Sequence, residues 1–572
     1  MSFFSELKRR NVIRIGIAYV VTAWVLVEAL SVLLPTFNAP DWVMRAVVLL
    51  LAAGMVIALL VAWLFELTPK GLKREDGSDT ADEAVFKART ARKADLVIIT
   101  VLSIAVIGFV AEKIWLSDIV RGNMNAIAIL PFTDTSPRHD QQYFAEGLTI
   151  ELLNMLSRMT DLRVIGKTSA FQFKGFKGDF STIGETLNVG TILEGSVNAV
   201  DDHVRITTNL IDAKQGHTLW SANYDRKLTN IFQVQDEIAR AVVRALQAQL
   251  IESQNKPLDR VVIAEAYTAY QQGSFLHGKL TVEDQNAAIV FFQQAAEKDP
   301  DFAEPLVGMA DANLMLALNM VAIDRDEGIG KATGYLDQAL RLNASLTDAL
   351  VSKAFIKQVN FRDYVGAELD LKRALETDPT HITALRRLGT LHGMQGRYDE
   401  ALGMFQKVID RDPLNTATYS NYSYHALAAG ELDVAEEMIK NVLIFSPKSI
   451  FAHFQMARIQ LARGDIDAAI VANELEPHPV WKNIGVGMIA CAQGDIAGGI
   501  AIADELIEQR EIFNAAEIYY MCGETDLVFE LMLDAAEDRD PALTEMKLSW
   551  AMTPLRSDPR WIEILKLMGL TV

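Results

Sequence analysis

Three prolines that recur every 34 residues constrain the fold of the C-terminal half of the chain. Pro379, Pro413 and Pro447 each follow a stretch of apolar and small residues with helical spacing. A fixed period of this length is typical of stacked helical hairpins, because one hairpin cannot bury its apolar face alone. Neighbouring hairpins bury that face against each other and form a solenoid. We therefore expect an all-α repeat array over residues 254–572.

The repeat at 382–415 shows which side chains hold one hairpin together. The signature positions of this repeat are occupied by Leu385, Leu388, Gly389, His392, Ala401, Phe405, Val408 and Pro413. Two signature residues of the next repeat are Ala435 and Pro447. Small residues are needed where the two helices approach closely, since a larger side chain would overpack the contact. This pattern resembles the tetratricopeptide repeat, which implies an inner groove that accepts peptides or protein surfaces. Roughly seven to nine hairpins fit the length, and residues 561–570 resemble the terminal capping helix of such arrays.

Three apolar runs near the N-terminus predict membrane spans at about 12–34, 43–65 and 96–116. A helix of about 20 residues crosses a bilayer core of about 30 Å. The third run contains Glu112 and Lys113 near its end, where both can reach the interface. A buried core helix is the alternative for each run. The sequence thus predicts a three-helix membrane region over residues 1–117.

The charges of the loops predict the orientation of these spans. Lys and Arg precede the first span and fill the loop between the second and third spans: Lys8, Arg9, Arg10, Lys70, Lys73, Arg74, Lys87, Arg89, Arg92 and Lys93. The short 35–42 loop has only Asp41. By the positive-inside rule the N-terminus is cytoplasmic, and residues after about 117 are periplasmic in a bacterial inner membrane. Glu28 lies inside the first span and is the one intramembrane polar candidate; a protonated or paired carboxyl near the outer interface is the alternative.

Residues 118–253 predict a small α/β domain with an antiparallel sheet. A short apolar strand at 126–132 precedes an amphipathic helix at 143–159, and alternating segments at 191–199, 203–212 and 217–225 form a meander. A short strand at 164–165, a helix at 180–187 and a long helix at about 231–250 complete the domain.

Several of these segments carry a resemblance to a known domain. Ile127–Phe132, Tyr143–Leu148, Leu193–Ser196 and Thr218–Trp220 resemble the TolB amino-terminal-like domain. Such domains often lie between a membrane, cyclase or winged-helix module and tetratricopeptide repeats, which implies contact with other proteins. Only about 11 residues precede the first span, so we expect neither a cyclase nor a winged-helix module here.

Composition argues against several kinds of site. The net charge of the chain is −20: residues 1–117 are slightly basic, and residues 118–572 have a net charge of −22. Such an acidic region excludes a nucleic-acid-binding surface, which needs clustered Lys and Arg. Gly166-Lys167-Thr168 resembles the end of a phosphate loop. However, the earlier glycine position is Asp161, and no helical pattern follows. We therefore expect no nucleotide and no other cofactor.

The remaining candidate ligands also point to structural roles. His381, His392, His425 and His453 lie in different repeats without metal-ligand spacing. Cys491 and Cys522 are expected to be buried as small apolar residues rather than joined by a disulfide. We therefore expect no catalytic residues and no metal site.

These observations together predict a non-enzymatic inner-membrane protein. Its periplasmic solenoid and TolB-like domain would scaffold or recognise envelope proteins, with protein or peptide partners and the lipid bilayer as its contacts. One alternative is a transmembrane signal transducer that acts through the cytoplasmic 67–94 loop. The other is an enzyme whose site no short motif reveals.

Overall fold

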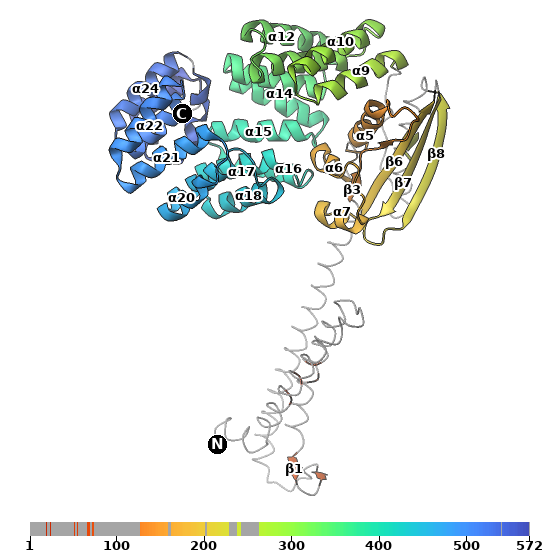
Figure 1. Ribbon diagram of the computed structural model, residues 1–572, viewed down its shortest axis with the longest axis horizontal. Coiled ribbons are helices and arrows are strands. Elements are labelled where there is room, and N and C mark those ends of the chain that lie inside the picture. Colours follow the sequence, from red (N-terminus) through yellow and green to blue (C-terminus); the bar gives the residue numbers. More distant parts are fainter. Residues whose placement is uncertain are drawn as a thin grey trace, which may run out of the picture. The chain divides into compact units, whose positions relative to one another are not determined.

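The computed structural model describes residues 126–157, 159, 162–200, 203–227, 237–238, 240–241, 262–538 and 540–570, with a few residues before 126 (Figure 1). The chain divides into two compact units, Met1–Ile114 and Trp115–Val572, which are described separately below.

The described part of the first unit is small. It contains the antiparallel hairpin of β1 (Glu66–Thr68) and β2 (Gly71–Lys73). The Tyr19 hydroxyl donates a hydrogen bond to the Leu51 carbonyl at 2.8 Å. Most of the three expected spans lies outside the described residues, as does Glu28. Among the residues that are described, no helix combines the length and the apolar character needed to cross a membrane.

A mixed β-sheet begins the second unit. Its strands are β3 (Ala126–Ile129), β4 (Thr133–Asp134), β5 (Arg163–Val164), β6 (Thr191–Val200), β7 (His203–Asp212) and β8 (Thr218–Lys227). The order is β5-β3-β6-β7-β8, with β4 beside β6. Strands β6, β7 and β8 form the expected antiparallel meander, but β3 pairs in parallel with both β5 and β6. The expectation of an antiparallel sheet is therefore wrong for this half, because a helix connects β3 to β5 and returns the chain in the same direction.

Three helices cover the two faces of the sheet: α5 (Gln142–Ser157), α6 (Lys167–Phe171) and α7 (Phe180–Leu187). Leu148 and Leu152 of α5 pack with Val204 and Ile206 of β7 on one face. On the other face, α7 packs against alanine residues of β3. Strand β3 is buried from end to end, as expected for a strand covered on both sides. The expected helix at 231–250 lies mostly outside the described residues, although Ile238 belongs to the core of the first face.

The rest of the unit consists of eight helical hairpins within the described residues. Their helices are α9 (Ala264–His277), α10 (Val282–Lys298), α11 (Glu304–Leu314), α12 (Arg325–Leu342), α13 (Thr347–Ile356), α14 (Tyr364–Thr377), α15 (Ile382–Met394), α16 (Tyr398–Ile409), α17 (Thr416–Ala429), α18 (Leu432–Phe445), α19 (Ala452–Arg463), α20 (Ile466–Glu474), α21 (Pro479–Gln493), α22 (Ile496–Glu508), α23 (Ile512–Met521) and α24 (Thr525–Glu537). Two 3₁₀ helices, η4 (Pro541–Leu548) and η5 (Thr553–Ser557), and helix α25 (Pro559–Leu567) end the chain.

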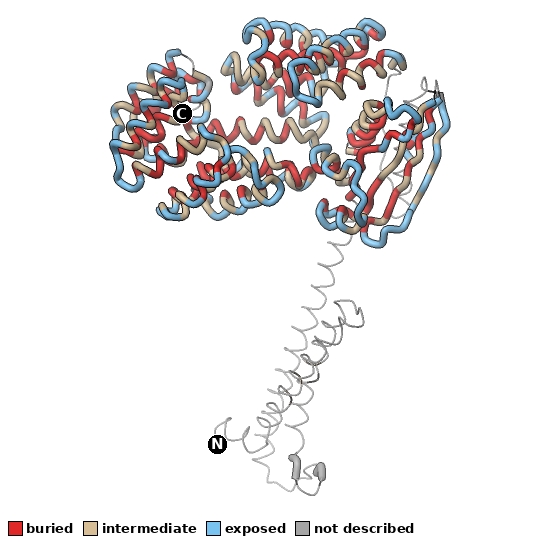
Figure 2. The backbone as a smooth tube through the Cα atoms, viewed as in Figure 1, coloured by how far each residue is buried: buried red, intermediate tan, exposed pale blue. Residues whose placement is uncertain are grey.

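The repeat-signature side chains lie where the two helices of a hairpin meet. Leu385, Leu388, His392, Ala401, Phe405, Val408 and Ala435 are all buried. A Cβ atom on Gly389 would lie 2.9 Å from the Phe405 ring, so α15 and α16 approach too closely there for a side chain. Figure 2 shows buried residues along the facing sides of the paired helices. Pro413 and Pro447 lie in the connections that follow α16 and α18, and Pro447 is exposed.

Two hairpins depart from the regular turn. In later hairpins a glycine with positive φ follows the first helix, as Gly430 and Gly464 do. In the hairpins of α11–α12 and α13–α14 the first helix ends in a π-helical turn, and Val321 and Arg362 take the left-handed conformation instead. Non-glycine residues pay a steric penalty in this region, so these two turns are strained.

Candidate binding site on the inner face of the repeats

The first helices of the hairpins form the inner face of the array. Helices α9, α11, α13, α15, α17, α19, α21 and α23 each contact the next member of the series as well as their own partner. The second helices contact one another much less. In a curved stack the more closely spaced helices lie on the concave side, so the series from α9 to α23 presents the inner surface.

The C-terminal segment covers this surface at the ends of α15 and α17. The Tyr398 hydroxyl donates to the carbonyl of Lys547, and the Tyr424 hydroxyl donates to the Glu545 carboxylate at 3.2 Å. Leu548 packs with Met394 of α15 and with Ala428 of α17. The expected groove is therefore not open along the whole array, since η4 occupies the inner face at the ends of these two helices.

A buried ion pair anchors the C-terminal segment. Arg458 of α19 and Glu517 of α23 are each 2% exposed and lie 3.1 Å apart. Ser549 donates a second hydrogen bond to the same Glu517 oxygen at 2.6 Å, and the Arg458 guanidinium lies over the Tyr424 ring. Breaking one partner of such a pair leaves an unpaired buried charge, which costs about 3–5 kcal/mol. The segment is thus part of the folded array.

The sheet domain packs against the first hairpin. Ala266 and Tyr267 of α9 belong to the same buried core as Leu148 and Leu152 of α5. Gly147 of α5 faces Gln271 of α9, and a Cβ atom on this glycine would come within 2.4 Å of the Gln271 amide nitrogen. The absence of a side chain at residue 147 therefore allows α5 and α9 to approach each other.

A second contact joins the sheet domain to the connection between α16 and α17. The backbone N–H of Gly166 donates to the carbonyl of Arg411 at 2.6 Å. The N–H and the hydroxyl of Ser169 both donate to the same Asp412 carboxylate oxygen, at 2.7 and 2.5 Å. Asp412 is 1% exposed, and a Cβ atom on Gly166 would lie 2.8 Å from its carboxyl carbon. The Gly166–Ser169 segment and the connection between α16 and α17 therefore pack closely and satisfy each other's hydrogen bonds.

This second contact explains the Gly166-Lys167-Thr168 motif. The expectation that no helix follows the motif is wrong, because α6 begins at Lys167. The helix has only five residues, and its Ser169 N–H is bound by the Asp412 carboxylate. A carboxylate from the repeats thus takes the position that a phosphate would need. The motif is a docking element between two parts of the chain.

The inner face of α11, α13 and the start of α15 carries a group of charged side chains. Asp311 of α11 accepts a hydrogen bond from the Ser352 hydroxyl of α13 at 2.6 Å, and burial raises the pKa of Asp311 to about 6. Burial likewise lowers the pKa of Arg386, and it lowers the pKa of Arg387 to about 10 together with the neighbouring Arg386 charge. All four side chains are partly or fully shielded from solvent. Sequence reasoning missed this group because its members lie on three different repeats.

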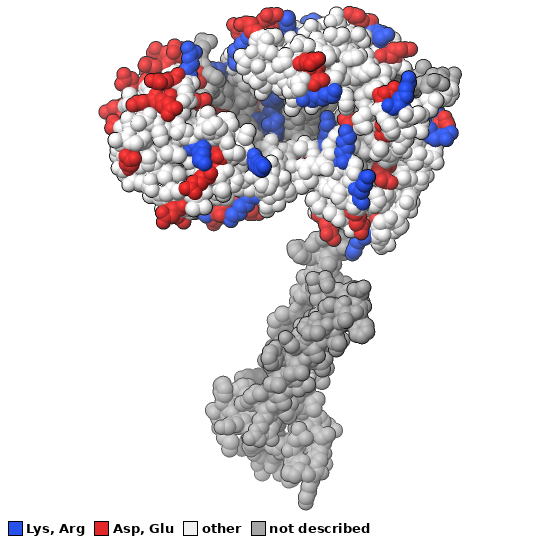
Figure 3. Space-filling view, viewed as in Figure 1, with Lys and Arg blue, Asp and Glu red and all other residues white. Residues whose placement is uncertain are grey.

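The charges are distributed unevenly over the described surface. In Figure 3, Asp and Glu dominate much of the outer rim of the repeats, whereas Lys and Arg appear toward the centre of the view. In a chain with a net charge of −20, unpaired cations stand out against their surroundings. The group on α11, α13 and α15 is therefore the best candidate for a binding surface.

The histidines have structural contacts. His381 caps α15 by accepting from the Ala384 N–H, and its other ring nitrogen lies 2.9 Å from an Asp348 carboxylate oxygen. His392 and His425 are buried between helices, and burial lowers the pKa of His425 to about 4. His453 lies 3.4 Å from the Pro447 carbonyl. Within the part of the chain that the structure describes, no cluster of His, Cys, Asp and Glu side chains suits a metal ion.

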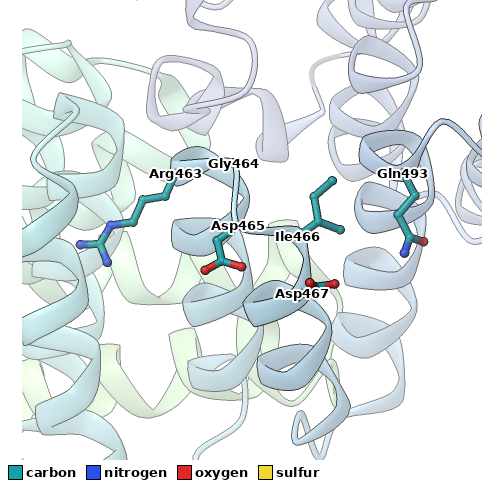
Figure 4. Close-up of a pocket in the computed structure, with 6 residues that line it drawn as sticks. All are labelled: Arg463, Gly464, Asp465, Ile466, Asp467 and Gln493. Carbon is teal, nitrogen blue, oxygen red and sulfur yellow. The ribbon is translucent and has the colours of Figure 1, made fainter.

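A hollow of about 680 Å³ lies at the turn between α19 and α20 (Figure 4). Asp465 lines it but caps α20 by accepting from the Ala468 N–H. Arg463 also lines it, but its guanidinium forms ion pairs with Asp433 and Glu436 of α18. Two of its three charged groups, Arg463 and Asp465, are thus already engaged, and this hollow is a weaker candidate than the inner face.

Cys491 and Cys522 form a disulfide that joins α21 to α23, with their Cα atoms 4.9 Å apart. The expectation of two separate buried thiols is therefore wrong. Gly499 of α22 lies beside both sulfur atoms, and a Cβ atom there would come within 2.4 and 2.6 Å of them. The missing side chain leaves the space that the bridge occupies. The sequence signal for this disulfide was the separation of 31 residues between the two cysteines, with Gly499 between them.

Comparison with known proteins identifies the repeats. Residues 394–450 match the family model described as Tetratricopeptide repeat. A protein of Rhizobium meliloti (strain 1021) that is named as an adenylate cyclase is 32% identical over 225 residues, which cover 39% of this chain and 37% of that protein. The TPR repeat-containing protein YpiA of Bacillus subtilis (strain 168) is 20% identical over 192 residues, covering 33% of this chain and 43% of that protein.

Among solved structures, a tetratricopeptide repeat protein from Parabacteroides merdae ATCC 43184 is 15% identical, with a TM-score of 0.33. The match covers 47% of this chain and 97% of that chain. The chain spans less than half the length of each of the two relatives above. The family match confirms the repeat type that the 34-residue period predicts, and residues 394–450 are tetratricopeptide repeats.

Proposed function

We propose that this chain is a non-enzymatic protein-binding scaffold whose partner segment lies on the inner face of α11, α13 and α15. One observation carries the proposal: η4 covers the ends of α15 and α17, whereas the inner face of α11, α13 and the start of α15 holds partly shielded charges of both signs. Tetratricopeptide arrays bind through such concave surfaces. Asp311 and Arg387 would orient the partner, and the apolar inner surface would supply contact area.

We further propose that the sheet domain is a TolB amino-terminal-like domain and that it forms one side of the binding surface. The end of α5 reaches the start of α15, where the Thr380 hydroxyl donates to the Ser157 carbonyl at 3.2 Å. Its two contacts with the repeats support this role, because they hold α5 beside the first helices. Partners are thus expected to touch both the repeats and α5.

The test is site-specific photocrosslinking in cells that express the full-length chain. A photoreactive residue at Thr390 lies on the same side of α15 as Arg386, one turn later. The control position is Val290 of α10, which is 53% exposed and lies on a second helix. We expect a defined crosslinked protein from Thr390 and none from Val290. Equal crosslinking at both positions would show that the inner face is not the binding surface.

We propose that the chain is a multi-pass protein of a bacterial inner membrane, with spans at 12–34, 43–65 and 96–116 and with residues after about 117 in the periplasm. The Cys491–Cys522 disulfide supports this location, because disulfides persist in oxidising compartments and are rare in the cytosol. The lipid bilayer is then a second partner. A periplasmic phosphatase reporter fused after Gly122 should be active, and the same reporter fused after Asp79 should be inactive. Equal activity at the two sites would contradict the third span.

Signal transduction is the second candidate function. The relative of Rhizobium meliloti that is named as an adenylate cyclase shares 225 aligned residues with this chain, which favours a role in signalling. The 67–94 loop would then contact a cytoplasmic partner, and the β1–β2 hairpin lies at its start. Crosslinking from Gly71 in that hairpin would distinguish the two functions: a cytoplasmic protein captured only when the periplasmic partner is present supports a transducer.

A further inference from the structure

We propose that Arg386 and Arg387 on the inner face of α15 bind a carboxylate group of an acidic partner segment. The proposal rests on the scaffold function above and names the chemistry of the partner. It concerns the surface that the C-terminal segment leaves uncovered.

The geometry of the two arginines places their charges beside the inner face. The Arg387 guanidinium lies over the Phe355 ring of α13, with 4.0 Å between the guanidinium carbon and the ring centroid. This stacking fixes the plane of the guanidinium, and its Nε atom is buried without a hydrogen-bond partner among the described residues. Arg386 precedes it on the same helix. Across the residues that the structure describes, neither guanidinium takes part in an ion pair.

A cation that is shielded from water and has no ion-pair partner raises the free energy of the folded protein. Two adjacent cations of this kind raise it further. Burial weakens the hydration of both groups, and each charge also raises the energy of the other. Both effects disfavour the charged form of Arg387, and burial and the Arg386 charge accordingly lower its pKa. A structural role would supply a carboxylate from the chain, as Glu517 does for Arg458. Here the chain supplies none at ion-pair distance, so a ligand is the remaining source of negative charge.

The surrounding groups select a carboxylate over a more highly charged anion. Asp311 lies near enough to Arg387 for their charges to interact, but its own hydrogen bond goes to Ser352. The two guanidinium charges are already partly balanced by Asp311, which favours a singly charged anion. A phosphate dianion would meet repulsion from Asp311 and from nearby Asp348. A planar guanidinium also matches a carboxylate through two parallel hydrogen bonds.

The site lies at the start of α15, whereas η4 contacts the end of this helix at Met394, and the site continues onto α13, which suits an extended protein segment. The Thr390 hydroxyl bonds to the Arg386 carbonyl one turn earlier and leaves the face beside the arginines polar. A segment rich in Glu or Asp would place one carboxylate on the arginines and continue along α13 and α15. Its affinity is expected to fall with added salt, because part of the attraction is between exposed charges.

The experiment compares two fluorescein-labelled decapeptides on the full-length chain in mild detergent. One peptide carries four Glu residues in a Gly-Ser background, and the other carries Gln at the same four positions. We expect the Glu peptide to bind the native protein at least about tenfold more tightly, as measured by fluorescence anisotropy. The double variant R386Q/R387Q should lose this preference, and R386K/R387K should keep part of it because Lys retains charge but not the planar fork. The control R341Q, at an exposed position on α12, should bind like the native protein.

Thermal unfolding supplies the second measurement. If the arginines serve a ligand, R386Q/R387Q should unfold at the same temperature as the native protein or higher, because two unpaired shielded charges are removed. A lower unfolding temperature with unchanged peptide preference would overturn the proposal and assign the arginines a structural role. Crosslinking separates the two proposals: a partner captured at Thr390 equally well in R386Q/R387Q leaves the scaffold function standing and refutes the carboxylate site, whereas no captured partner at all refutes the scaffold function.

Discussion

Substitution of Asp412 by Ala should open the contact between the sheet domain and the repeats. The Asp412 carboxylate accepts two hydrogen bonds from Ser169 and a third from the Asn415 amide at 2.9 Å. Ala would leave these donors without acceptors in a place that is 1% exposed. Each such loss costs about 1–2 kcal/mol, so the three together cost about 3–6 kcal/mol. Asp412→Asn keeps one carbonyl oxygen for Ser169 and should cost about a third as much.

Hydrogen exchange reports on this contact directly. The N–H of Gly166 donates to the Arg411 carbonyl, and the N–H of Ser169 donates to Asp412, so both amides exchange only when the contact opens. We expect the exchange of both amides to rise by at least about a hundredfold in Asp412→Ala, while amides of α13 stay protected. Asp399→Ala is the matched control, since its exposed side chain lies at the start of α16, at the other end of the helix from the contact. If the Gly166 amide exchanges equally slowly in both variants, the reasoning is refuted.

Three further changes test the repeats. Gly389→Leu should cost about 1–3 kcal/mol in urea unfolding because of the Phe405 contact, whereas Gly403→Leu should be nearly neutral because nothing lies within 4 Å of its Cβ position. Reduction of the Cys491–Cys522 disulfide should lower stability by about 2–4 kcal/mol, and thiol labelling before reduction should find no free cysteine in the native protein. The pKa of His425 is lowered to about 4 by burial, so the unfolded chain binds a proton first as the pH falls. The contribution of His425 to the free energy of unfolding should therefore fall by about 1.4 kcal/mol for each unit that the pH drops between about 6.5 and 4. His425→Gln should remove this part of the slope in urea titrations.

The repeats were predictable because their determinants are local and periodic. Proline spacing and small residues such as Gly389 and Ala401 report on contacts between helices that are adjacent in sequence. The meander of β6, β7 and β8 was predictable for the same reason, since its alternation and turns are local. The parallel pairing of β3 with β6 was not, because the strands are separated by more than 60 residues and three helices.

The docking contacts and the binding face depend on long-range geometry. Asp412 meets Ser169 across 243 residues, and neither residue type at its position signals the other. Gly166 suggested a phosphate loop, although its small size serves a close approach to a carboxylate. The arginine pair on α15 gains its meaning from the absence of an acid at ion-pair distance among the described residues, and a sequence does not display which charges remain without an ion pair. The disulfide likewise depends on Gly499, which lies between the two cysteines in the chain and beside both sulfurs in space.

The attachment of the sheet domain to the repeats at α9, before α15 and after α16 changes the mechanics of the array. A free solenoid behaves as a spring, because each hairpin holds only its neighbours and small rotations add up along the stack. Here α5 is fixed to α9 at one end, and Ser169 is fixed to the connection after α16 at the other. The sheet domain holds the four hairpins between these points at both ends, so the curvature of this section cannot change without breaking one attachment. Tension applied to the sheet domain would accordingly reach both ends of the braced section at once, while the hairpins from α17 onward rely on the disulfide and η4 for their stiffness.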